Sequence, residues 1–192
     1  RDFTREFSQE LRLESDFDGR FNFMIGGNYF DQYKTRVADF THVTIAARQQ
    51  QLGLSAVFDS LTTESRPVKT KSVGVFGELY FELSDSTRLT GGLRYSHDDK
   101  TILTRQIFLN PQANGSPPPF TFGEFKKGVV TGRVVLDHRF SSDLLGYLSL
   151  SRGYKAGGIN PGDVGATTAG FAPEFLNAGE FGLKGSTSDG TF

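Results

Sequence analysis

Apolar and polar side chains alternate along several segments of this chain, and this period of two constrains the fold more than any other feature. In the range 3–17, Phe3, Phe7 and Leu11 fall on one side, while the other side is almost wholly charged or hydroxyl-bearing. Strict alternation predicts a β-strand with two unlike faces. The pattern returns at 20–30, 71–83, 89–96, 130–140, 144–151 and 174–185. The sequence therefore predicts an all-β chain.

The connections between these segments alternate in length. Short turn signals lie at 18–19, 84–86 and 141–143, whereas the ranges 31–69, 97–124 and 157–173 are long and lack sustained alternation. In a meander, all short turns then fall at one end, as in outer-membrane barrels and unlike a Greek-key sandwich. We predict an antiparallel up-and-down transmembrane β-barrel segment of about seven strands, belonging to a larger barrel.

The charged side of the strands supports a membrane barrel over a dry core. A sandwich would have to bury these charges or leave one whole face in water. In a wide membrane barrel the apolar face meets lipid and the charged face meets a wet lumen. We therefore expect five lumen-facing charges, which either bind substrate or form cross-strand pairs and hydrate the wall. They are Glu10, Arg12, Glu78, Arg94 and Arg133.

Composition and motifs exclude several other classes. The 21 basic and 22 acidic residues give a net charge of -1, so nucleic acid is not an expected partner. The chain has no cysteine and no apolar run long enough for a spanning helix. Ser151, His138 and Asp137 lack a nucleophile motif, so we predict no enzyme. No cofactor is predicted, and the run 97–99 predicts no metal site because adjacent strand residues face opposite ways.

A basic, glycine-rich stretch ends the segment 144–151. Arg152, Tyr154 and Lys155 are candidates for contact with an anionic ligand or a lipopolysaccharide phosphate, and the alternative is an interfacial anchor. We expect Gly157-Gly158 to release the chain into an external loop.

Several segments resemble successive barrel strands of TonB-dependent outer-membrane receptors of the siderophore-receptor kind. They are 8–15 (SQELRLES), 75–78 (VFGE) with 89–95 (LTGGLRY), 147–160 (YLSLSRGYKAGGIN) and 180–184 (EFGLK). The resemblance implies that 1–192 is part of a 22-stranded barrel in the bacterial outer membrane, with the plug domain absent from this chain. It also implies import of a scarce ligand, most often a ferric siderophore, with energy from the TonB complex acting through the missing plug domain. Outer-membrane lipid and lipopolysaccharide are the implied surroundings, and a plug is a further implied contact for the lumen-facing charges.

Two alternatives remain open at the level of sequence. One is a passive outer-membrane porin, and the other is a soluble β-rich carbohydrate-binding module. The sequence indicates no particular substrate.

Overall fold

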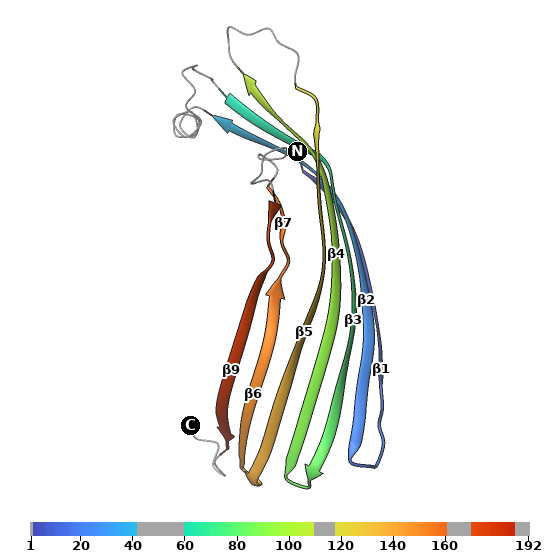
Figure 1. Ribbon diagram of the computed structural model, residues 1–192, viewed down its shortest axis with the longest axis vertical. Helices are drawn as coiled ribbons and strands as arrows, with labels where there is room; N and C mark the ends of the chain where they lie inside the picture. Colours follow the sequence, from blue (N-terminus) through green and yellow to red (C-terminus); the bar gives the residue numbers. More distant parts are fainter. Residues whose placement is uncertain (1, 42–59, 110–117, 161–169, 187–192) are drawn as a thin grey trace.

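A computed structural model describes residues 2–41, 60–109, 118–160 and 170–186 of the chain (Figure 1). They form one seven-stranded sheet in the order β1-β2-β3-β4-β5-β6-β9, in which every neighbouring pair is antiparallel. The strands are β1 (Phe3–Glu14), β2 (Phe21–Thr41), β3 (Ser60–Ser84), β4 (Thr87–Leu109), β5 (Thr121–Ser141), β6 (Leu144–Lys155) and β9 (Glu174–Gly185). The predicted all-β meander of seven strands is confirmed. Among the described residues, no helix is long and apolar enough to cross a membrane.

The apolar side chains lie on one face of the sheet and do not converge into a core. Phe7, Leu93 and Val134 are 59%, 69% and 51% exposed, and the only buried apolar side chains in the described residues are Ile102 and Val129. The strand register places these three exposed residues on a common side, here called the outer face. The opposite side, here called the inner face, carries Glu10, Arg12, Glu78, Arg94 and Arg133. This sidedness is the one predicted for a barrel wall between lipid and water.

The long strands extend well beyond the ranges that alternation predicted. The loop predicted at 31–69 is wrong in part, because β2 continues to Thr41 and β3 begins at Ser60. The loop predicted to end near Glu124 is also shorter, since β4 runs to Leu109 and β5 begins at Thr121. Apolar and polar side chains alternate along a strand only where its two faces meet different surroundings, such as lipid on one side and water on the other. Where both faces meet polar surroundings the ladder continues but the pattern is lost.

The first turn also differs from the prediction. β1 ends at Glu14 instead of Phe17, and the tight turn expected at Asp18-Gly19 is a longer connection. The Asn22 side chain accepts a hydrogen bond from the Phe17 amide at 2.8 Å and donates another to the Phe17 carbonyl at 3.2 Å. Asn22 thus satisfies the Phe17 backbone groups outside the ladder.

The loop predicted at 157–173 contains a small hairpin that folds onto the inner face. β7 (Gly158–Ile159) pairs with β8 (Gly170–Phe171), and residues 161–169 lie outside the described residues. β7 contacts β4 and β5 without joining their ladder, and the upper part of the sheet bends over the side on which β7 lies (Figure 1). The inner face is therefore the concave side of the wall.

Candidate functional site on the inner face

The central feature of the inner face is an ion pair that spans three strands. Arg133 on β5 donates two hydrogen bonds to the Glu78 carboxylate on β3, at 2.7 Å from Nε and 3.0 Å from Nη2. Gly92 on β4 lies between them in the register. A Cβ atom at Gly92 would come within 3.0 Å of Glu78, so this glycine leaves the path over β4 open. Bidentate pairing orients both side chains flat along the wall.

A second cluster forms one register row further along the strands, around the Phe76 ring. The guanidinium carbon of Arg94 lies 5.3 Å from the ring centroid, and that of Arg12 lies 5.9 Å from it. Gly26 on β2 lies under the ring, because a Cβ atom there would be only 2.6 Å from Phe76. Two cations therefore flank one aromatic side chain, a geometry that favours positive charge at the ring face.

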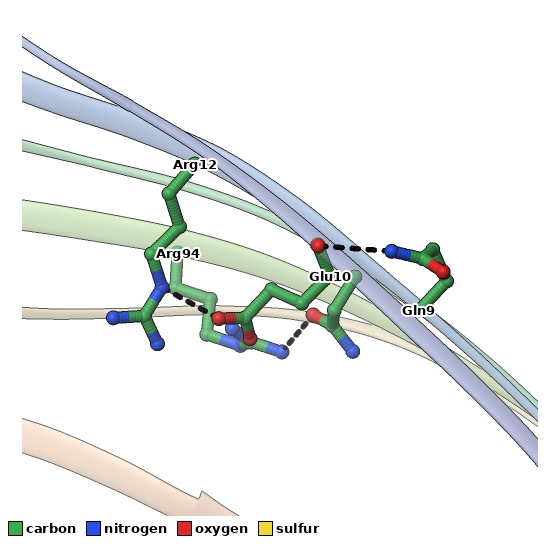
Figure 2. Close-up of polar contacts among 5 residues, drawn as sticks. Gln9, Glu10, Arg12 and Arg94 are labelled. Carbon is green, nitrogen blue, oxygen red and sulfur yellow. Dashed lines mark hydrogen bonds and ion pairs between the residues drawn. The ribbon is translucent and has the colours of Figure 1, made fainter.

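Hydrogen bonds hold these two guanidinium groups in place. Arg12 Nε donates to Glu10 at 2.5 Å within β1, and Arg94 Nη2 donates to Asn28 at 2.6 Å over Gly74. Figure 2 shows Glu10, Arg12 and Arg94 projecting from the same side of the sheet, with Gln9 on the other side.

The five predicted lumen charges thus share one face, and each has a partner that the structure identifies. The Arg133–Glu78 pair and the Arg94–Asn28 hydrogen bond cross strands, whereas Glu10 and Arg12 pair within β1. Contact of the five charges with a ligand or a plug stays a prediction. A groove of about 360 Å³ runs between the two clusters. Its lining includes Phe76, Glu78, Arg94, Arg133, Ser151 and Arg152.

The three candidates at the end of β6 do not form one cluster. Arg152 lies 4.7 Å from the centroid of the Phe175 ring, and Lys155 lies 3.8 Å from Glu174, both across the β6–β9 pair. Tyr154 instead donates a hydrogen bond of 2.6 Å to Asp98 on β4. The pairing of β5 with β6 ends at Gly132–Arg152, so the two strands separate before Tyr154. The phenol of Tyr154 can then reach past β5 to Asp98 on β4. Their contact with an anionic ligand or lipopolysaccharide stays a prediction.

Tyr154 belongs to a connection between β6 and the inner wall. Lys100 donates a hydrogen bond of 2.6 Å to the Gly157 carbonyl and lies 5.8 Å from the Phe125 ring centroid. Gly157 is buried, and a Cβ atom there would be 2.4 Å from the Phe171 carbonyl and 2.7 Å from Phe125. Gly157 therefore allows close packing at the point where the chain leaves the seven-stranded sheet, since β6 ends at Lys155. Its expected role in releasing the chain into an external loop stays a prediction.

Sequence analysis missed several residues of these contacts. Asn28, Phe76, Asp98 and Lys100 all lie on the inner face, and Asp98 is only 6% exposed although it is charged. Alternation places Asn28 and Phe76 on this face, but the strand register that brings them to Arg94 is not visible in one sequence. Asp98 and Lys100 fell in a range predicted as loop.

The residues considered for catalysis and metal binding are dispersed. His138 lies on the outer face and bonds Thr87 at 2.8 Å, while Ser151 is on the inner face opposite Arg133. Within the described residues, no group of three or more histidine or acidic side chains is placed to hold a metal ion.

Comparison with known proteins identifies the family to which this sheet belongs. Residues 2–192 match the family model described as TonB dependent receptor-like, beta-barrel. The chain belongs to this family. A similar solved structure is the ferric yersiniabactin uptake receptor FyuA from Yersinia pestis, with a TM-score of 0.71 and 18% identity. The match covers 97% of this chain and 27% of that chain, so this chain spans about a quarter of the FyuA structure.

As part of a TonB-dependent receptor barrel, the chain is an outer-membrane protein and its family is one of transport receptors. The alternatives of a passive porin and a soluble carbohydrate-binding module are set aside by this membership. β1 and β9 are the edge strands of the described sheet, where other parts of the barrel would pair.

Proposed function

We propose that the protein containing this chain imports an iron–siderophore complex across the outer membrane, with energy from the TonB system. Membership of the TonB-dependent receptor family carries this proposal, and the fold shared with a ferric siderophore receptor supports it. In the intact receptor, a plug domain beyond this chain would fill the lumen and connect it to TonB.

The wall itself has properties that suit such a passage. Its inner face presents the guanidinium groups of Arg12, Arg94 and Arg133 toward the lumen, each held by a neighbouring side chain. Held in this way, they lose little conformational entropy when an anionic or polar surface docks against them. Either a ligand on its way through the lumen or the surface of the plug would meet these groups.

The test uses the full-length receptor in its own host under iron limitation. Deletion of the gene should abolish growth and uptake of radioactive iron with at least one ferric siderophore, and inactivation of TonB should do the same. Uptake that continues without TonB would refute the energy coupling. Unchanged iron uptake together with lost uptake of haem, vitamin B12 or a glycan would refute the siderophore assignment.

A matched pair of variants tests whether the inner face is in the route. Arg94→Gln removes a lumen guanidinium, whereas Arg5→Gln removes one from the outer face of the neighbouring part of the wall. Slower uptake in the first variant with normal uptake in the second supports the route. The reverse order would contradict it.

A further inference from the structure

One long edge inside the sheet has a neighbouring strand on one side only. β5 pairs with β4 from Thr121 to His138. On its other side, β5 pairs with β6 only as far as Gly132–Arg152. Within the part of the chain that the structure describes, residues 121–131 of β5 therefore have no strand on the β6 side, and this stretch is here called the free edge.

Contacts on the inner face draw β6 away from the free edge. Tyr154 donates a hydrogen bond of 2.6 Å to Asp98 on β4, and Lys100 donates one of 2.6 Å to the Gly157 carbonyl. β6 still pairs with β9 up to its last residue, so it stays a regular strand while it leaves β5. The end of β6 is thus held over the inner face and does not continue beside the free edge (Figure 1).

The free edge lies above the lipid. On β5 the outer-face apolar side chains extend from Phe140, beside the short turn, to Val130, and the charged Lys126 and Glu124 follow. About ten residues of a strand tilted by roughly 40° rise about 25 Å, which is the height of the apolar band of such barrels. The unpaired backbone groups of the free edge therefore meet water, which lipid could not replace as a hydrogen-bonding partner.

The free edge lacks most of the features that protect exposed strand edges. Proteins protect such edges with prolines, bulges, short strands or charged side chains. The range 121–131 contains no proline, and its register with β4 has no bulge. The charge of Lys126 is compensated, because its Nζ lies 2.6 Å from Glu124 and 3.6 Å from Asp99. The free edge is therefore long, regular and open to pairing with another strand.

Two cations beside the free edge form no ion pair among the described residues. Lys127 lies on the edge and is exposed, and its register neighbour Asp98 is hydrogen-bonded to Tyr154 instead. Arg152 lies at the last β5–β6 pair, where its guanidinium carbon is 4.7 Å from the Phe175 ring centroid. An acidic segment that lies along the free edge therefore gains charge-assisted contacts with both cations.

We propose that the free edge of β5 binds an extended acidic peptide as an additional β-strand. Backbone hydrogen bonds to the free edge supply the affinity, and carboxylates beside Lys127 and Arg152 supply the preference for an acidic sequence. The free edge accommodates a segment of roughly ten residues, about 35 Å long. This peptide-binding function goes beyond the import of a siderophore and does not depend on it.

The experiment uses the full-length receptor in nanodiscs and a fluorescent peptide of about ten residues in which threonine and glutamate alternate. Fluorescence anisotropy measures the affinity of this peptide. Lys127→Gln should weaken binding about fivefold, and the double variant with Arg152→Gln more than about tenfold, because each substitution removes a charge-assisted contact. Lys71→Gln is the matched control, since Lys71 is 58% exposed on β3, away from the free edge. It should leave the affinity unchanged.

Two further measurements test the backbone contacts. The same peptide is N-methylated either at its threonines or at its glutamates, and at least one of these two forms should bind more than about tenfold more weakly, because its amides cannot donate to the free edge. Hydrogen exchange should slow in residues 121–131 when the unmodified peptide binds, and should not change in residues 71–80 of β3.

Several results would overturn the proposal. They are a failure of the unmodified peptide to bind, undiminished binding of both methylated forms, or slowed exchange confined to other parts of the wall. Equal losses in Lys127→Gln and Lys71→Gln would also overturn it, because they would indicate a general attraction between charges. Heat-modifiable migration in gels confirms that each variant is folded before it is titrated.

Discussion

The sidedness of the wall predicts opposite outcomes for the same substitution at two adjacent positions. Val134 is on the outer face, next to Gly91 and Leu150 in the register, and Val135 is on the inner face beside Thr90 and Ser149. Six residues separate Val134 from Phe140 at the short-turn end, a height of roughly 15 Å within an apolar band of about 25 Å. Val134 therefore lies near the bilayer midplane. Val134→Arg should destabilise the intact barrel by about 2–4 kcal/mol.

Val135→Arg is the matched control. Its guanidinium would enter the wet lumen among hydroxyl side chains, so we expect a loss below about 1 kcal/mol. The full-length receptor is refolded into lipid vesicles and titrated with guanidinium chloride, with folding followed by heat-modifiable gel migration. Equal losses at the two positions, or a larger loss for Val135→Arg, would refute the assignment of the faces.

Two other predictions concern the inner face. Gly92→Val places a side chain in the path of the Glu78–Arg133 ion pair. It should destabilise the barrel by only about 1 kcal/mol, because this ion pair is partly exposed. Gly91→Val is the control and should not destabilise the barrel, because it lies on the outer face and its added Cβ would have no atom within 4 Å. A denaturant midpoint that moves equally in both variants would contradict the role of Gly92. Tyr154 lies beyond the apolar band, and its pKa is raised above 10.0 by burial and by its hydrogen bond to Asp98. The stabilisation from its neutral phenol is present at lower pH and is lost as the pH rises through the raised pKa. A difference titration of phenolate absorbance between the receptor and Tyr154→Phe should show one phenol titrating above its ordinary value, and titration at or below 10 would contradict the contact.

The sequence predicted the membrane-spanning part of the fold well because lipid and lumen impose different side chains on alternate positions. The short turns at 84–86 and 141–143, the strand order and the inner position of Glu78 and Arg133 all follow from that pattern. The predictions for 31–41, 60–69 and 97–109 were wrong because those parts of the strands rise above the lipid, where the pattern no longer distinguishes strand from loop. Hydrogen bonding between strands continues there regardless of the side chains.

The candidate site could be predicted only as a face, because its contacts depend on glycines whose effect appears across strands. Gly26, Gly74 and Gly92 each lie under a side chain from an adjacent strand, so a long polar or aromatic group can lie flat over the backbone. From the sequence alone, a glycine within a strand indicates that the strand is less stable there. In the sheet it is the position that lets Arg133 reach Glu78 and Phe76 approach Arg12. Glycines at these positions thus leave room on the inner face for charged and aromatic side chains to lie flat. Their occurrence on three neighbouring strands, β2, β3 and β4, is itself a signal that cross-strand contacts will form there.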